Sequence, residues 1–389
     1  MNQATVENTE IVSLLQPILS DGFQGLPKAL ESIINLAMQF ERERHLQAAR
    51  YERTQTRDGF ANGFKPKTLK TSVGPLDLQI PQVRGCSTPF YPSCLEKGTR
   101  IDRSVSMAIA EMYLQGVSTR RVQRVFEELC GMDVTSEQVS RASALLDEEA
   151  AKWRNRPIGE VKILFADATY LKVRVNGLVV TQAVFVVTGI LADGHRSILA
   201  VETGSGESEV LWRQVFSGLL RRGMHGVSLV VSDQHKGLRA ALQAILCGVP
   251  WQRCQMHLQR NAQSYVSKKS ESDGVASDIR AVFNAPSLQE ARRLLDLVLQ
   301  KYAKDSGLCT WLEENLPDAF TVYQFPEALR KRIRTNNIEE NLNRQIKRRT
   351  NLITVFPNEN SMLRLVASIC MEISQEWEAH AIYLDVRNL

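Results

Sequence analysis

Paired cysteines are missing from this sequence of 389 residues, although it contains seven cysteines. No two of them stand two residues apart in a CxxC pair, and their odd number and wide spacing exclude a disulfide framework. They are Cys86, Cys94, Cys130, Cys247, Cys254, Cys309 and Cys370. This usage is typical of reduced thiols in a cytoplasm.

Long apolar runs are missing as well. The most apolar stretch, LVVTQAVFVVTGILA from Leu178, is interrupted by Thr and Gln and is too short to span a bilayer. The first residues, MNQATVENTEIVSLL, have no basic region followed by an apolar core, so no signal peptide is expected. We therefore expect a soluble, cytoplasmic protein without a membrane partner.

Net positive charge is scarce over most of the chain and concentrated in one segment. The formal net charge is +5, with 43% hydrophobic and 23% charged residues, an ordinary globular composition. From Arg330 to Thr350, eight Lys or Arg and two Glu give a local charge of +6, so the remainder is close to neutral. A concentrated basic segment favours a polyanionic partner, although a solvated helix face has the same composition.

The N-terminal part of the chain shows a helical pattern followed by a β pattern. Residues 1–55 are predicted to be helical, with an apolar stripe that serves a core, a dimer seam or DNA binding. Residues 56–100 are predicted to form a small β module with basic edges. Its hairpin strands, residues 68–73 and 76–80, are expected to join at Gly74-Pro75.

Residues 101–155 return to a helical pattern with three short helices and tight turns. This is the outline of a helix-turn-helix DNA-binding domain, although many three-helix bundles bind nothing. The stops and caps are Gly116, Ser118 or Thr119, Gly131, and Thr135 or Ser136. The residues expected to contact DNA are Arg120, Arg121 and Arg124.

From Val161 the pattern predicts an α/β domain. The strand-like runs VKILFADATYLKVRV, LVVTQAVFVVTGI and RSILAVET follow one another, with Asn176-Gly177 as a hairpin turn between the first two. A helix and the apolar strand VSLVVSD come next. Three antiparallel strands, a helix and a parallel fourth strand match the first half of an RNase H-like fold, although other α/β folds share this order.

Two aspartates mark a candidate site in this domain. Asp167 lies among apolar residues of the first strand, where a carboxylate is costly unless it is paired or binds metal; an edge position is the alternative. Asp233 ends the fourth strand, where α/β sheets bind ligands and where an Asp also caps helices. If these strands are neighbours, the carboxylates face each other and suit Mg²⁺. A third carboxylate would complete a two-metal site for attack on a phosphodiester.

Two adjacent glutamates in the basic segment are candidates for the third carboxylate. The segment is predicted to be a helix, and Glu340 stands four residues before Arg344, the spacing of a surface ion pair. Glu339 has no cation at that spacing and flanks the buried stripe, so Glu339 is the predicted ligand. The buried stripe comprises Ile338, Leu342 and Ile346.

Several blocks in order resemble the transposases of the IS256 family of bacterial insertion sequences, relatives of the Mutator transposases. They run from about residue 55 to near the C-terminus and include NGFKPKTLKTSVGPLDLQIPQVRG, ADATYLKVR, VVSDQHKGLRAAL, WQRCQMHLQRN and RIRTNNIEENLNRQIKRRT. The resemblance implies a DDE transposase whose metal ligands are Asp167, Asp233 and Glu339, with a one-residue ambiguity from Glu340. It also implies an RNase H-like core in two parts, residues 156–250 and 331–389, around a mostly helical insertion at residues 251–330.

Further residues match signatures of the family. Cys254 and His257 match its C/D-x2-H element, which supplies only two of the four ligands of a structural zinc. A structural or active-site-supporting role is the reading that we favour. Gly307 and Trp311 resemble a GxxxW element of the related insertions, where an aromatic ring is suited to stack on an extruded base; a core position is the alternative for Trp311.

We therefore expect a transposase that binds the terminal inverted repeats of its own element and cleaves and joins DNA with two Mg²⁺ ions, or with Mn²⁺ in their place. The expected partners are the double-stranded DNA of the repeats and the target, and a second copy in a homodimer, because two ends must be joined. The alternatives are an RNase H-like nuclease without strand transfer and a domesticated, non-catalytic DNA-binding protein. The cations expected to neutralise phosphates at the site are Arg332, Arg334, Arg344, Lys347, Arg348 and Arg349.

Overall fold

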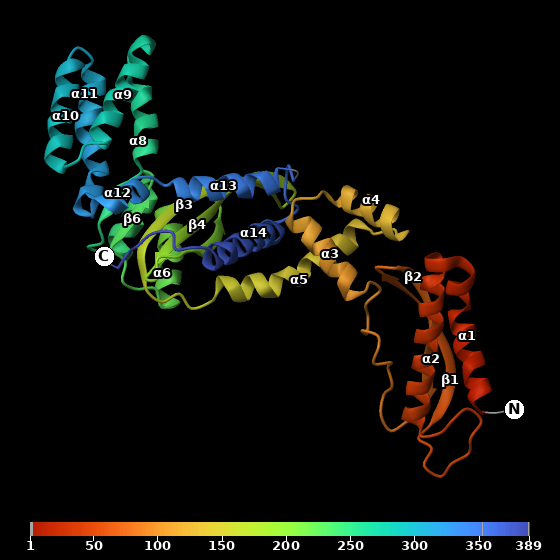
Figure 1. Cartoon of the computed structure of the whole chain (residues 1–389). Helices are drawn as coiled ribbons and strands as arrows, with labels where there is room; N and C mark the ends of the chain where they lie inside the picture. Colours follow the sequence, from red (N-terminus) through yellow and green to blue (C-terminus); the bar gives the residue numbers. More distant parts are fainter. Residues whose placement is uncertain (1–2, 352, 388) are drawn as a thin grey trace. The chain divides into compact units, whose positions relative to one another are not determined.

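A computed structural model of the chain describes residues 3–351, 353–387 and 389 (Figure 1). It separates into two units, Met1–Leu145 and Leu146–Leu389, and each unit has apolar clusters of its own. Among the described residues, no helix combines the length and the apolar character that crossing a membrane requires.

The first unit opens with helices followed by a two-stranded antiparallel hairpin. One face of the second strand is apolar because Leu76, Leu78 and Ile80 alternate with polar residues, and they cluster with Met38 of the second helix. The elements are α1 (Gln3–Asp21), η1 (Gly22–Gly25), α2 (Leu26–Leu46), β1 (Phe60–Thr71) and β2 (Gly74–Arg84).

The hairpin turn lies closer to the N-terminus than its sequence indicates. Thr71 pairs with Gly74, so the two-residue loop is Ser72-Val73. Gly74 has a φ of 118°, which only glycine adopts readily, and it begins β2 together with Pro75. The prediction of a turn at the Gly-Pro dipeptide is therefore wrong, because the glycine supplies the backbone conformation at the entry to the strand.

Three helices joined by tight turns follow, as the sequence predicts, and the third continues past the end of the first unit. Ser118 caps the second of them by accepting a hydrogen bond from the Arg121 N–H, and Gly131 follows its end at a φ of 60°. The Thr135 hydroxyl accepts a hydrogen bond from the Gln138 N–H at the start of the third. The helices are α3 (Arg103–Leu114), α4 (Thr119–Cys130) and α5 (Ser136–Arg154). Their buried cluster includes Val105, Ile109, Val122, Phe126 and Val139.

The second unit is built on a five-stranded mixed sheet with the order β5-β4-β3-β6-β7. β3, β4 and β5 are antiparallel, whereas β6 pairs in parallel with β3, and β7 with β6. The predicted order of three antiparallel strands and a parallel fourth is confirmed, and the fifth strand adds to it. The strands are β3 (Val161–Val175), β4 (Leu178–Leu191), β5 (Arg196–Gly204), β6 (Leu229–Ser232) and β7 (Trp251–Arg253).

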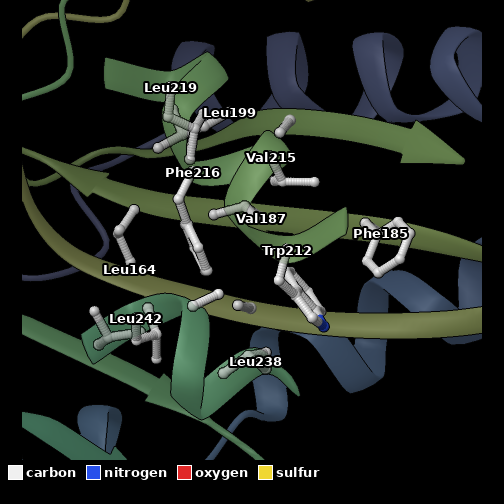
Figure 2. Close-up of a cluster of buried hydrophobic side chains, with 14 of the residues drawn as sticks. Leu164, Phe185, Val187, Leu199, Trp212, Val215, Phe216, Leu219, Leu238 and Leu242 are labelled. Atoms are coloured by element: carbon white, nitrogen blue, oxygen red, sulfur yellow. The ribbon is translucent and has the colours of Figure 1, made fainter. Parts of the chain in front are cut away.

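The alternation of side chains along β3 assigns each residue to one face of the sheet. Leu164 packs with Trp212 and Phe216 on one face (Figure 2). Phe165 packs on the other face, in a cluster with residues of the helices that precede and carry the two glutamates. Asp167, two residues further on, lies on this second face. The helices are α6 (Glu209–Arg221) and α7 (Lys236–Ile245) on the first face, and α12 (Glu327–Ile333) and α13 (Asn337–Thr350) on the second.

Along the chain, a helical segment with its own buried cluster lies between β7 and α12. Its elements are α8 (Gln255–Ala262), η2 (Gln263–Tyr265), η3 (Lys269–Glu271), α9 (Ser272–Phe283), α10 (Leu288–Lys301), α11 (Ser306–Asn315), η4 (Leu316–Ala319) and η5 (Thr321–Gln324). The last helix, α14 (Glu359–Ala379), packs beside β5, where the Ser374 hydroxyl accepts a hydrogen bond from the Ile198 N–H at 2.9 Å.

Candidate active site

One pocket in the second unit is lined by three carboxylates from three elements. Asp167 belongs to β3, Asp233 directly follows β6, and Glu340 lies in the first turn of α13. β3 and β6 pair in parallel up to Ala166 and Ser232, so the next residue of each strand lies about one strand spacing from the other. The strand order therefore brings the two predicted aspartates together, and α13 adds a third carboxylate to the same pocket.

Cations share this pocket with the carboxylates. It is lined by Arg260 and His257 from α8 and by Arg344, Lys347 and Arg348 from α13. The three α13 residues are exposed to solvent. Four Lys or Arg against three carboxylates leave the pocket with a slight positive balance, which suits a polyanionic ligand.

The other three cations predicted for this segment are not among the residues that line the pocket, and each has a partner within the protein. Arg349 forms a bidentate ion pair with Glu372 of α14. Arg334 donates a hydrogen bond of 2.7 Å to the asparagine that follows α9. The Arg332 guanidinium lies 4.8 Å from the centre of the Tyr383 ring. Three of the six predicted cations therefore line the pocket, and the other three contact partners within the protein.

Burial and like charge act together on Asp167. They raise the pKa of its carboxyl to about 7, with burial as the largest cause and Asp233 as the next. Asn343 of α13 donates a hydrogen bond of 2.8 Å to Asp167 Oδ2, and the Ala168 N–H donates one of 3.0 Å to Oδ1. A divalent cation bound beside Asp167 would offset the negative charge that this carboxylate shares with Asp233 and would favour its ionised form.

We expect Asp167→Asn to stabilise the metal-free protein at pH 8. The ordinary pKa of 3.8 applies in the unfolded chain and a pKa of about 7 in the folded one, so the folded state binds more protons between these values. Folding stability then falls as the pH rises through this window, and asparagine abolishes that loss. The variant should melt roughly 4 °C above the wild type at pH 8, with a smaller difference at pH 5. Melting curves in EDTA check this, and no gain at pH 8 would contradict it.

Glu339 is buried in the protein core and is not among the residues that line the pocket. Its carboxyl group lies beside Thr188 of β4 and Cys370 of α14. Burial raises the pKa of Glu339 well above its ordinary value, and the neighbouring Thr188 offsets this only in part. The carboxyl therefore favours its neutral form, whereas a metal ligand must be ionised.

Glu340 faces the pocket instead. Its Oε1 atom lies 3.4 Å from His257 Nε2, and its charge contributes to the raised pKa of Asp167. The sequence predicts a surface ion pair of Glu340 with Arg344, but the helix directs Glu340 toward α8. The structure thus groups Glu340, rather than Glu339, with the two aspartates.

Hydrogen bonds across three elements fix the start of α13. The Asn336 N–H donates to Cys254 Sγ and its Nδ2 to the Ala166 carbonyl, both at 3.2 Å. The Gln255 N–H donates to the Arg334 carbonyl at 3.0 Å. Cys254 is buried, and burial raises the pKa of its thiol, which leaves it an inert structural group. The two halves of the C/D-x2-H element therefore differ: the cysteine anchors α13 and the histidine faces Glu340.

No three His, Cys, Asp or Glu side chains in the described part of the chain converge on a point that could hold a metal ion. The three pocket carboxylates line one space without meeting at one point. Mg²⁺ commonly takes one or two carboxylates and completes its octahedron with water and substrate phosphate, so this open oxygen set fits it. Asn343 Oδ1 has no hydrogen-bond partner among the described residues, which leaves an acceptor at the pocket.

A polar group beside the two aspartates has no clear signal in the sequence. Glu207 accepts hydrogen bonds from the Tyr170 hydroxyl and the Trp212 indole N–H, each at 3.1 Å, and lies 3.5 Å from His235 Nδ1. Burial, followed by Glu207, raises the pKa of Tyr170, and Glu207 adds to the raised pKa of Asp167. Glu207 stands in the turn before α6, where the sequence pattern indicates only an acidic helix start.

Trp311 packs within the helical segment. Its ring stacks on Tyr265 with centroids 5.0 Å apart, and the Arg253 guanidinium lies 5.6 Å from its centre. It also packs against the buried cluster of that segment and is not among the residues that line the acidic pocket. These surroundings are those of a core position, which is the alternative given for Trp311 from the sequence.

The arginines predicted to contact DNA in the first unit lie on one side of α4. Arg120, Arg121 and Arg124 are exposed, whereas Val122 and Phe126 of the same helix are buried. The arrangement leaves three cations available to a partner.

Exposed cations on a three-helix cluster, and a pocket that combines carboxylates with cations, are typical of proteins that act on nucleic acids. Residues 3–380 match a family described as "Transposase, Mutator family". The chain belongs to this family of transposases.

Its relatives agree with the family match. A transposase for insertion sequence element IS406 from Burkholderia multivorans is 46% identical over 383 residues, which cover 98% of both chains. A transposase for IS256 in transposon Tn4001 from Staphylococcus aureus is 33% identical over 378 residues, 96% of this chain and 95% of that protein. The resemblance to IS256-family transposases is confirmed. A solved viral intasome in complex with the PP2A regulatory subunit B56 gamma is 12% identical, covers 40% of this chain and 49% of that chain, and has a TM-score of 0.19, too low to inform the fold.

Proposed function

We propose that this transposase is a DDE enzyme in which Asp167, Asp233 and Glu340 hold two Mg²⁺ ions, or Mn²⁺ in their place. The observation that supports this most strongly is the single pocket that all three carboxylates line. The sheet order β5-β4-β3-β6-β7, with antiparallel strands followed by parallel ones, supports an RNase H-like core. Glu340 takes the place of Glu339 because Glu339 is buried outside the pocket and favours its neutral form.

The chemistry that two bound Mg²⁺ ions supply is activation of the attacking hydroxyl and stabilisation of the leaving oxygen. The residues of this chain position the carboxylates for it. Asn343 holds Asp167 through the 2.8 Å hydrogen bond from α13 to β3. His257 lies beside Glu340 at 3.4 Å and orients it toward the pocket. Water attacks first to free a 3′-OH, which then attacks a second phosphodiester in the target DNA.

The cations of the pocket hold the DNA backbone near the carboxylates. Arg344, Lys347 and Arg348 stand three and four residues apart on α13, so they share one side of the helix. Arg260 of α8 lines the same pocket. Phosphate neutralisation by such cations supplies affinity that does not depend on sequence.

The DNA bound is proposed to be the terminal inverted repeats of the element, which the helices α3 to α5 recognise, together with target DNA. The exposed arginines of α4 support this role. Two copies of the chain act together, because two ends of one element must be joined.

We expect residues 1–155, which contain the first unit and all of α5, to bind terminal-repeat duplex about 10³-fold more tightly than unrelated duplex. The affinity should fall steeply with salt, because phosphate contacts release counterions. A gel-shift competition with unrelated duplex of equal length measures both. Equal competition by the two duplexes would show that sequence recognition lies elsewhere.

Incubation of the purified chain with labelled terminal-repeat duplex tests the proposed function. Nicking and strand joining are expected in Mg²⁺ and neither in EDTA. Nicking without joining would favour the nuclease alternative, and binding without nicking in Mg²⁺ or Mn²⁺ would favour the non-catalytic one.

A further inference from the structure

We propose that a basic groove on the β-hairpin of the first unit binds the phosphate backbone of duplex DNA, a proposal that rests on the DNA-binding function above. The groove, called here the hairpin groove, lies between β1 and the segment that follows β2. Its cations are Lys65, Lys67, Lys97 and Arg100.

The charge of the hairpin groove is of one sign. Four of its lining residues are Lys or Arg, and no Asp or Glu is among the described residues that line it. Lys65, Lys97 and Arg100 are exposed. Lys67 is bound to the protein, because its Nζ donates to the Tyr91 hydroxyl and to a backbone carbonyl, each at 3.2 Å. Concentrated positive charge without neighbouring acid is the electrostatic signature of a phosphate-binding surface.

The lysines of β1 stand where packing alone would favour apolar residues. Leu78 and Ile80 of β2 face the core formed with α2, and their cross-strand partners on the same face are Lys67 and Lys65. Leu69, next on that face, keeps the apolar pattern and packs against the core. The face therefore changes from apolar to cationic where the hairpin groove begins.

The aromatic residues of the hairpin groove are already engaged, so the ligand is backbone phosphate rather than unstacked bases. Tyr91 packs against the cluster of α2 and β2 and carries the bond from Lys67. The Phe90 ring lies 5.1 Å from His45, tilted by 43°. Base stacking on single strands needs a free aromatic face. The exposed cations remain for the backbone of a duplex.

The hairpin groove is continuous with the three-helix cluster. Residues 98–100 line both this groove and a second pocket, which reaches Gln138 and Arg141 in the first turns of α5. The Lys70 N–H donates to the Arg100 carbonyl at 2.9 Å, which joins β1 to this segment. In helix-turn-helix proteins the N-terminal turns of the third helix read base edges. The hairpin groove therefore extends along the DNA backbone beside the bases that α5 contacts.

The test compares two triple variants of the full-length chain with equal loss of charge. Binding to terminal-repeat and to unrelated duplex is measured by fluorescence anisotropy at several salt concentrations. The groove variant's salt slope should fall by about 2.7, or 0.9 per lost phosphate contact, so it should bind both duplexes roughly 500-fold more weakly at 0.1 M salt than the wild type. The control variant should change the slope by less than about 1. The groove variant is Lys65→Gln, Lys97→Gln, Arg100→Gln, and the control is Arg44→Gln, Arg50→Gln, Arg53→Gln.

Each outcome decides a different question. If the groove variant keeps the wild-type slope, or loses no more than the control, the hairpin groove is not a DNA site, whatever the wild type cleaves. If the wild type binds DNA without cleaving it, the catalytic proposal fails. The comparison of salt slopes between the groove variant and the control still shows whether the hairpin groove binds DNA. Both variants should keep the wild-type melting temperature. If the groove variant does not fold, Lys97→Gln alone should lower the slope by about 0.9, and an unchanged slope would overturn the proposal.

Discussion

Glu340→Gln is expected to reduce cleavage of terminal-repeat DNA by roughly three orders of magnitude, about 4 kcal/mol at 1.36 kcal/mol per tenfold. The substitution keeps the shape of the side chain but removes the charge that Mg²⁺ requires at the pocket. Glu339→Gln should keep most of the activity, because the Glu339 carboxyl is buried outside the pocket and already favours its neutral form.

The two glutamine variants are matched controls for each other. They differ by one position on α13, or about 100° around the helix, so both side chains cannot face the same ions. Both should be assayed on the same duplex at saturating Mg²⁺, and melting temperatures show whether each variant is folded. An inactive, folded Glu339→Gln beside an active Glu340→Gln would contradict the structural assignment and restore the one made from the sequence.

Asp167→Asn is expected to abolish cleavage and to leave the affinity for end DNA within about threefold of the wild type. Loss of a metal ligand disables the chemical step, whereas affinity comes mostly from phosphate contacts elsewhere. Parallel cleavage and gel-shift measurements check the two halves of this result. Asp193→Asn, in an exposed turn between β4 and β5, is the control and should cleave normally. Cleavage by Asp167→Asn in Mg²⁺ would remove Asp167 from the site.

The sequence predicts the two aspartates of the pocket because strand periodicity and strand order depend on local pattern. An apolar run places Asp233 at the end of a buried strand, and a parallel pair places it beside Asp167. The caps at Ser118 and Thr135 were predictable for the same reason, since each satisfies helix N–H groups close in sequence.

Which of the two glutamates lines the pocket was not predictable, because tertiary contacts decide it. From helix spacing alone, a residue that flanks the buried stripe is expected to be accessible to a ligand. In the fold, β4 and α14 cover that flank and bury Glu339, while bonds from Asn336 to Cys254 and Ala166 hold the helix in this rotation.

Whether Arg349 is available to DNA could not be predicted from local charge either. A basic run indicates a polyanion partner, but the pairing of Arg349 with Glu372 depends on α14, which follows later in the chain. Local charge therefore located the basic segment without showing which of its cations are available to DNA.

Anomalous scattering from a crystal of the chain with Mn²⁺ and terminal-repeat DNA would test the proposed site most directly. We expect manganese peaks within roughly 2.2 Å of carboxylate oxygens of Asp167 and Asp233, with a carboxylate oxygen of Glu340 among the ligands and a DNA phosphate completing the coordination. Glu339 should remain buried against Thr188. Manganese bound by Glu339, or bound away from the two aspartates, would contradict the assignment of this pocket as the active site.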